Sequence, residues 1–293
     1  MLFETYNQPW DYELLDTGNS FRLEKWGEVI LMRPDPQAIW QPTLPQKEWS
    51  RAWAVYRAGS NESGGKWEIK KTMPSPWNIK FSGVQMSLKL SPFKHTGVFA
   101  EQAAQWDWMT KQLSSYQVIT LKDKPKILNL FAYTGAASMV LAKAGCYVTH
   151  VDASKPAITW ANENAELNKL SQNSIRWILD DAVKFVQREI KRGQKYDGII
   201  LDPPAFGHGP SGKTWKFSRD VPRLLSDCVK LLSLKTAFLL INGYATNSSA
   251  ISLNNILEDT MAGKGGKIEF GELCLKQKSG RMISTGIFAR WSK

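Results

Sequence analysis

An alternation of apolar strand patterns and helix patterns, starting near residue 98, constrains the fold more than any other feature of this sequence. Each short apolar run is followed by an amphipathic segment that has its own start and stop signals, such as Ser154 before one helix and Gly145 after another. This alternation predicts a parallel sheet of right-handed βαβ units. Strands are expected at 126–131, 147–151, 175–179, 196–201 and 237–241, and helices at 101–113, 136–144, 155–170, 182–192, 221–232 and 249–261.

The last part of the sequence departs from this alternation. Two β-prone runs, 267–275 and 282–291, flank a turn at Ser279–Gly280. A parallel sheet that ends in such a hairpin is expected to close with an antiparallel strand. The fold class predicted for residues 93–293 is therefore a doubly wound, Rossmann-like α/β sheet whose final strand is antiparallel.

The first 90 residues have a different pattern, with short β-prone runs separated by turns and prolines. The runs span 21–32, 52–57, 66–71 and 77–90, and the segment 61–65 is expected to form a hairpin loop. Because prolines between the runs disfavour long helices, we expect a small, mainly β domain at 1–92 beside the larger domain at 93–293.

Charge and cysteine content narrow the class of protein. The net charge is +11, of which residues 1–90 carry only +1, so the excess lies in the larger domain and favours a polyanionic partner. Cys146, Cys228 and Cys274 are scattered singly, which predicts reduced core cysteines with neither a disulfide nor a metal site. With no signal-like start and no long apolar run, we expect a cytoplasmic protein that does not enter a membrane.

Ligands of open α/β sheets bind beyond the carboxyl ends of the strands, and the first two predicted strands end in suggestive residues. After the first strand, Gly135 is the only glycine in the turn, which is too few for the G-x-G-x-x-G cradle of a dinucleotide but sufficient for a phosphate-free nucleoside. The second strand ends in Asp152, 17 residues later, where a carboxylate can bind a ribose diol. The alternative for Gly135 is a simple strand-to-helix turn.

The third and fourth strands also end in acidic residues. Asp181 can accept a hydrogen bond from an adenine amino group, or it can cap the helix beginning at Ala182, and both roles can coexist. The fourth strand runs into Asp202-Pro203-Pro204, whose prolines hold the backbone extended and aim carbonyls and the Asp202 side chain into the cleft. Phe206 can stack on a flat base. We therefore predict that Asp202, Pro203 and Phe206 serve the chemistry.

These residues resemble class I S-adenosylmethionine (SAM)-dependent methyltransferases, and more narrowly the group of bacterial 23S ribosomal RNA methyltransferases that modify cytosine C5 or guanine N7. The similarity lies in the segments 94–102, 129–135, 152–156, 162–168 and 201–206. It implies SAM as the cofactor, an RNA substrate, and the antiparallel closing strand that these enzymes have. By this resemblance Phe99 and Gln102 line the cofactor pocket, and Tyr133, Thr134, Gly135 and Ala136 face the methionine moiety.

The resemblance also implies that Asp152 binds the ribose and Asp181 the adenine. The complete set of predicted cofactor-binding residues is Phe99, Gln102, Tyr133, Thr134, Gly135, Ala136, Asp152, Ala153, Ser154, Asp181, Ala182 and Asp202.

One departure from the group bears on mechanism. Its C5-cytosine members carry a cysteine just after the strand that follows Asp-Pro-Pro, because C5 becomes nucleophilic only after a thiolate adds at C6. Here that strand reads Ala237 to Tyr244 without a cysteine. This disfavours C5 chemistry and favours direct transfer to a nitrogen, or with less support an oxygen.

The loop after Phe206 combines basic and aromatic side chains, as single-stranded RNA requires. The predicted substrate-binding residues are Phe206, Lys213, Trp215, Lys216 and Arg219. An ordinary solvated basic loop is the alternative. Other functions that fit the same motifs are a small-molecule or protein methyltransferase and a SAM- or RNA-binding protein without catalysis; a nicotinamide oxidoreductase fits least.

Overall fold

The computed structural model describes residues 1–59, 64–115, 124–208 and 214–293. They form two compact units. The first unit comprises Met1–Glu4, Ala104–Leu273 and Gly286–Lys293, and the second comprises Thr5–Ala103 and Cys274–Thr285. The sequence predicts a single boundary at 92/93, whereas the chain passes between these units four times. The short segments near both ends of the chain that belong to the other unit leave no local signal in the sequence.

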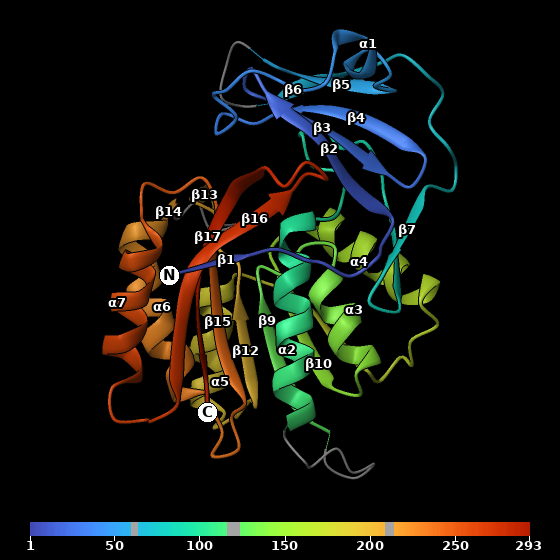
Figure 1. The fold of residues 1–293 in the computed structure, drawn as a ribbon. Coiled ribbons are helices and arrows are strands. Elements are labelled where there is room, and N and C mark those ends of the chain that lie inside the picture. The colour runs from blue at the N-terminus through green and yellow to red at the C-terminus, as the bar shows by residue number, and fades with distance from the viewer. Residues whose placement is uncertain (60–63, 116–123, 209–213) are drawn as a thin grey trace. The chain divides into compact units, whose positions relative to one another are not determined.

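The first unit is built on an eight-stranded sheet in the order β1-β16-β17-β15-β12-β9-β10-β11. Five of its strands, β9, β10, β11, β12 and β15, are parallel, while β17 pairs antiparallel with β15. This confirms the predicted fold class with its antiparallel final strand (Figure 1). The bounds are β1 Leu2–Glu4, β9 Lys126–Leu130, β10 Tyr147–Asp152, β11 Ile175–Leu179, β12 Gly198–Leu201, β15 Phe238–Gly243, β16 Lys267–Lys276 and β17 Met282–Ser292.

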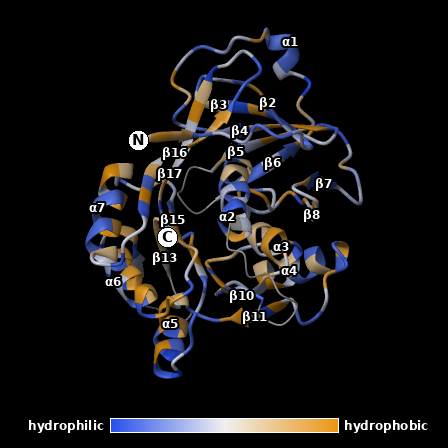
Figure 2. Ribbon diagram, turned by 60° about the horizontal axis from the view of Figure 1, so that its bottom comes forward, coloured by the Kyte–Doolittle hydropathy of each residue, from blue (hydrophilic) through white to orange (hydrophobic). Residues whose placement is uncertain are grey.

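Helices cover both faces of this sheet. On one face lie α5 (Ala182–Lys191), α6 (Phe217–Lys230) and α7 (Ala250–Met261), and on the other lie α2 (Ala103–Ser115), α3 (Ala136–Lys143) and α4 (Lys155–Leu167). Figure 2 shows apolar and polar residues mixed along α6 and α7, as expected for helices that bury one side only. Among the helices of the described residues, none has the length and apolar character that crossing a bilayer requires.

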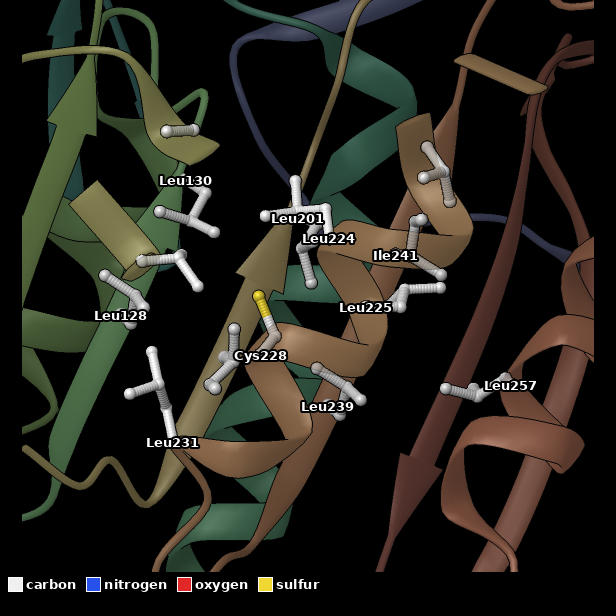
Figure 3. Packing of buried hydrophobic residues seen from close by; sticks show 14 of the residues in the cluster. Leu128, Leu130, Leu201, Leu224, Leu225, Cys228, Leu231, Leu239, Ile241 and Leu257 are labelled. Atoms are coloured by element: carbon white, nitrogen blue, oxygen red, sulfur yellow. The ribbon is translucent and has the colours of Figure 1, made fainter. Parts of the chain in front are cut away.

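The core of the first unit lies between the strands and helices α5 to α7. Leu128, Leu130 and Leu201 point from the sheet toward Leu224 and Cys228 of α6 (Figure 3). Fully burying a leucine side chain contributes roughly 1.5–3 kcal/mol, so this cluster is a major source of stability. Because side chains alternate along a strand, the residue between the two β9 leucines faces the other side of the sheet.

Three helices of the first unit begin at the side-chain caps that their sequences suggest. The Ser154 hydroxyl accepts a hydrogen bond from the Ala157 amide at 3.3 Å, and Ser249 does the same for Ser252 at 3.2 Å. The Asp181 carboxylate caps α5 by accepting from the Lys184 amide at 2.9 Å. Each cap satisfies an amide that the first helical turn leaves without a backbone partner.

The second unit has a five-stranded sheet, β2-β3-β4-β5-β6, and a separate β7–β8 hairpin. All its strand pairs are antiparallel except β4–β5, in line with the predicted mainly β character. The expected run at 21–32 is two strands separated at Gly27, and most of the expected loop at 61–65 falls outside the described residues. The bounds are β2 Tyr12–Gly18, β3 Phe21–Trp26, β4 Val29–Pro34, α1 Gln46–Trp49, β5 Ala54–Ala58, β6 Gly65–Ile69, β7 Asn78–Phe81, β8 Val84–Ser87 and the 3-10 helix η1 Ala100–Gln102.

Candidate active site

Four parallel strands of the first unit have their carboxyl ends at the same level of the sheet. Leu130 of β9 pairs with Val151 of β10 and with Leu201 of β12. Asp152, in turn, is opposite Leu179 of β11. The sheet thus brings the loops that begin at residues 131, 152, 180 and 202 to one edge, where ligands of this sheet type bind.

The loop after β9 is a tight turn with an unusual backbone. Phe131, Tyr133 and Gly135 all have positive φ angles, of 57°, 50° and 87°. Two of these are not glycines, so neighbouring groups must stabilise a conformation that L-residues otherwise avoid. Two contacts do so: the Tyr133 amide donates to Asp152 Oδ2 at 2.8 Å, and Asn164 Nδ2 of α4 donates to the Thr134 carbonyl at 3.0 Å.

Asp152 is half-buried at the end of β10 and has a raised pKa. Burial raises the pKa of its carboxyl, and the amides of Ser154 and Tyr133 offset part of that rise. Oδ1 accepts from the Ser154 amide at 2.8 Å, as Oδ2 does from Tyr133. Each carboxylate oxygen has a second lone pair, so the oriented carboxylate can still accept the two hydroxyls of a ribose. This arrangement fits the nucleoside part of SAM.

Asp181 adopts the capping role considered as its alternative. Its carboxylate accepts from the Lys184 amide, while its own amide donates to Asp180 Oδ1 at 2.8 Å. Asp180 is turned toward Arg188, with which it forms an ion pair. Adenine recognition by Asp181 stays a prediction. The neighbouring Leu179 side chain is 52% exposed at the same strand end and offers an apolar surface beside it.

The Asp202-Pro203-Pro204 corner follows β12. Pro203 is buried and Pro204 exposed, and the Asp202 amide donates to the Leu130 carbonyl at 3.3 Å, which joins the corner to the loop after β9. The Pro204 carbonyl accepts from the Trp215 indole at 2.7 Å. The sequence predicts that carbonyls of this corner face a ligand, but the Pro204 carbonyl instead binds the loop that follows.

That loop contains a short hairpin, β13 (Phe206–His208) with β14 (Thr214–Lys216). The ring centroids of Trp215 and Phe131 are 5.4 Å apart, so Trp215 packs onto the turn after β9 in addition to donating a hydrogen bond to Pro204. Phe206, in contrast, is 54% exposed. Of the two aromatic residues predicted to bind substrate, Phe206 is therefore the one with a face open to a base.

The predicted basic residues of this loop differ in their surroundings. Arg219 pairs with Asp220, at 2.8 Å between Nη2 and Oδ2, and also donates to the Thr214 carbonyl, so much of its charge is used by neighbours in α6 and β14. Lys216 is exposed at the start of α6. Lys213 lies outside the described residues.

The remaining predicted cofactor residues divide between the two units. Tyr133 to Ala136 and Asp152 to Ser154 come together in the first unit through the contacts above, and Ala182 is buried in the first turn of α5. Phe99 and Gln102, at the start and end of η1, belong to the second unit. The part of these two residues in cofactor binding stays a prediction.

The three cysteines are free and buried, as predicted. Burial raises the pKa of Cys146 to about 12, and it raises the pKa of Cys228 as well. Cys146 precedes β10, at the opposite edge of the sheet from the loops described above. Within the described ranges, no group of three His, Cys, Asp or Glu side chains is arranged to hold a metal ion.

The sequence reasoning missed three residues that shape this site, Phe131, Asn164 and His150. Asn164 lies in the segment 162–168, which was predicted to matter only through the resemblance to methyltransferases. Its buried amide donates to the Thr134 carbonyl. His150 is the third residue from the end of β10 and lies under the turn. A histidine within an apolar strand was the signal in the sequence that pointed to His150, although only the strand register reveals its neighbours.

A comparison with protein families decides the class of this site. The model of the S-adenosylmethionine-dependent methyltransferases matches residues 47–273. The chain belongs to this family. It is therefore a methyltransferase that uses SAM, which confirms the predicted cofactor and enzyme class.

Individual relatives agree with this assignment. The methyltransferase is 38% identical to a crystal structure of the SAM-dependent methyltransferase from Agrobacterium tumefaciens, with a TM-score of 0.91 over 99% of this chain and 92% of that one. A Streptococcus mutans structure, with a TM-score of 0.71 at 16% identity, covers 96% of this chain and 75% of its own and shares the fold alone.

Two curated relatives carry ribosomal names. Ribosomal RNA large subunit methyltransferase K/L of Pseudoalteromonas atlantica is 37% identical over 52% of the chain, and methyltransferase I of an Enterobacter species is 31% identical over 45%. The chain spans only 20% and 32% of the lengths of these relatives.

Proposed function

We propose that this methyltransferase transfers the methyl group of SAM to a nitrogen of a ribosomal RNA base, by direct attack and without a cysteine nucleophile. The observation that carries the proposal is the edge of the sheet beyond β12 and β15. There the Asp202-Pro203-Pro204 corner stands beside the exposed ring of Phe206, and β15 ends in Asn242-Gly243 with no thiol. The names of the curated relatives support RNA as the substrate.

Bound SAM supplies a methyl group activated by its sulfonium charge. The acceptor nitrogen uses its lone pair to form the new bond to the methyl carbon while the carbon–sulfur bond breaks, and the sulfur keeps that electron pair. For a ring nitrogen, whose lone pair lies in the plane of the base, this step needs alignment more than activation. We assign the alignment to the rigid Asp202–Pro204 backbone and to stacking on Phe206. The Asp202 carboxylate is assigned to accept any proton that the acceptor nitrogen loses.

The absence of a thiol in the right place argues for direct transfer. Addition to cytosine C6 needs a thiolate, and the raised pKa values of Cys146 and Cys228 keep both protonated. Cys274 lies in β16 within the second unit, where it is buried. None of the three positions suits a covalent intermediate with a base.

Incubation with isotope-labelled SAM and unmodified 23S ribosomal RNA tests the proposal. We expect label in one nucleotide, identified after digestion by mass spectrometry as an N-methyl base. RNA containing 5-fluorocytosine, which traps enzymes that use a cysteine nucleophile, is expected to give no covalent complex. A trapped complex, or label at carbon 5 of cytosine, contradicts direct transfer to nitrogen.

Charge reversal separates RNA from a small-molecule or protein substrate. Lys216→Glu, alone or with Lys213→Glu, is expected to raise KM for RNA at least fivefold, because both lysines follow Phe206 closely in the sequence and carry positive charge. Lys126→Glu, at the opposite edge of the sheet, serves as the matched control. Equal kinetics for all three variants count against RNA. With a ribosomal substrate we also propose a cytoplasmic location.

A further inference from the structure

Three buried polar side chains lie beneath the turn at 131–135, and none of them takes part in the proposed transfer step. Asn129 of β9, Ser138 of α3 and His150 of β10 are only 2%, 0% and 0% exposed. The strand register places Asn129 directly beside His150, with Trp177 of β11 on its other side. Polar groups in such a position destabilise a fold unless they bind one another. We call these three residues the histidine network.

Hydrogen bonds link the three side chains of the histidine network. Asn129 Nδ2 donates to Ser138 Oγ at 3.0 Å, and Ser138 Oγ lies 3.0 Å from His150 Nδ1. Burial lowers the pKa of His150 to about 3, so the ring is neutral and carries a hydrogen on one of its two nitrogens. In the tautomer where the Ser138 hydroxyl donates to Nδ1, that hydrogen lies on Nε2.

The imidazole of His150 lies against the turn at 131–135. His150 Nε2 is buried and, among the described residues, has no partner of good hydrogen-bond geometry. The backbone of Tyr133 interacts with the imidazole and offsets part of the decrease in the pKa of His150. A Cβ atom added to Gly135 would lie 3.4 Å from His150 Cε1, so the ring lies directly against the turn.

The conformation of the turn explains why such support matters. Tyr133 has a φ of 50°, a conformation that L-residues avoid and that persists only where neighbouring groups hold it. Its amide donates to Asp152, and its backbone also acts on the imidazole of His150. The backbone of Tyr133 thus interacts with a carboxylate and with a neutral histidine.

We propose that His150 is a positioning residue, whose Nε2–H supports the Tyr133 backbone and presets the turn at 131–135 for the methionine end of SAM. The inference depends on the predicted role of Tyr133 to Ala136 in cofactor binding. A histidine that only fills the core would affect stability and leave cofactor affinity unchanged.

Two substitutions at position 150 separate these roles. His150→Phe keeps a flat ring and removes both nitrogens, and we expect the Kd for S-adenosylhomocysteine, measured by calorimetry, to rise about tenfold. His150→Gln places an amide donor near the position of Nε2 and is expected to stay within threefold of the parent protein. With SAM as the varied substrate, KM should rise in His150→Phe while kcat at saturation changes less than twofold.

Tyr196→Phe is the matched control. It removes a buried hydrogen bond of 2.6 Å, from Tyr196 to Glu189, near the amino end of β12 in the same unit. Its melting temperature is expected to fall as in His150→Phe, with an unchanged Kd for S-adenosylhomocysteine. An unchanged Kd in folded His150→Phe overturns the proposal, as does an equal loss of affinity in Tyr196→Phe.

Ser138→Ala provides a second route should His150→Phe fail to fold. It leaves the imidazole in place without its hydroxyl partner, and we expect a three- to fivefold rise in Kd; no rise overturns the proposal. Combining it with His150→Phe should weaken affinity no further than His150→Phe alone.

The failure of the RNA proposal would look different. In that case the parent protein binds S-adenosylhomocysteine, and responds to these substitutions, but transfers no methyl group to RNA. If instead Asp152→Ala binds S-adenosylhomocysteine as tightly as the parent protein, the assignment of the turn to the cofactor fails, and the role of His150 fails with it.

Discussion

Two clusters of buried polar side chains, one in each unit, are stabilised in different ways. The histidine network of the first unit is neutral and is linked by hydrogen bonds between uncharged groups. The cluster in the second unit consists of charged groups: Glu24 accepts two hydrogen bonds from Arg33, at 2.6 and 2.8 Å, and lies 3.4 Å from Arg22, which in turn approaches Asp35 at 3.5 Å. We call these four residues the ion cluster.

Both groups support a segment that carries predicted cofactor residues. The histidine network lies under Tyr133, and Arg33 of the ion cluster donates to the Lys94 carbonyl at 3.0 Å, at the start of the segment that leads to Phe99. The difference teaches that a segment can be held in place by either chemistry, but the penalties for disturbing them differ. A buried ion pair that loses one partner leaves an unpaired charge, whereas a broken neutral network leaves only an unpaired dipole.

Removing a cation from the ion cluster should therefore have the largest effect. Burial raises the pKa of Glu24, but Arg22 and Arg33 outweigh this and hold it below its ordinary value, so the carboxyl is charged. Arg33→Met leaves that charge without its bidentate partner and is expected to lower the free energy of unfolding by about 3–5 kcal/mol. Urea unfolding followed by circular dichroism measures it. A loss below about 1 kcal/mol would show that the ion cluster and the histidine network do not differ as described.

Breaking the histidine network should cost less. Ser138→Ala leaves both the Asn129 amide and His150 Nδ1 without the shared hydroxyl, and we expect a loss of about 1–3 kcal/mol in the same urea experiment. Should Ser138→Ala destabilise the protein more than Arg33→Met, the proposed order of penalties is wrong.

Acid provides a milder disturbance of the histidine network. The folded pKa of His150, about 3, lies below the ordinary value near 6.5, so the unfolded chain takes up this proton first as the pH falls. Stability should therefore decrease below pH 6.5, by about 1.4 kcal/mol per pH unit for this residue. Unfolding of the parent protein and His150→Gln at pH 6.5 and 5.5 isolates the contribution. Equal losses in both proteins mean that His150 does not titrate as inferred.

An exposed ion pair of the second unit should matter least. Arg57 and Glu68 lie 3.1 Å apart with side chains 58% and 49% exposed. Arg57→Met is expected to change the free energy of unfolding by less than about 1 kcal/mol, and by still less in 1 M salt. The same measurement serves as the control for Arg33→Met, since both remove an arginine from a carboxylate in the same sheet. A similar loss in the two variants would mean that burial is not what distinguishes the ion cluster.

Features set by neighbouring residues in the sequence were predicted well. The capping Ser154, the turn at Gly145 and the strand ending in Asp152 depend on local patterns of period and capping, and the structure has all three. Of the two roles predicted for Asp181, the structure contains the helix cap, and adenine binding stays a prediction.

Features set by strand register and tertiary packing were not predictable in the same way. Trp215 looked like a stacking surface, yet its indole bonds a carbonyl eleven residues earlier in the chain. His150 gained its role only because β9 and β10 align it with Asn129. In both cases the sequence pattern shows the type of side chain, whereas the fold determines its partner.

The pairing of β1 with β16 has a consequence for synthesis and for protein engineering. Leu2 to Glu4 bind alongside Gly271 to Leu273, residues made some 270 positions later, so the outermost strand of the sheet waits for translation to be nearly complete. A fragment starting at residue 93 would lack β1 and leave the edge of β16 bare, as a template for pairing with another chain. Neither unit can be cut out of the gene as one continuous segment.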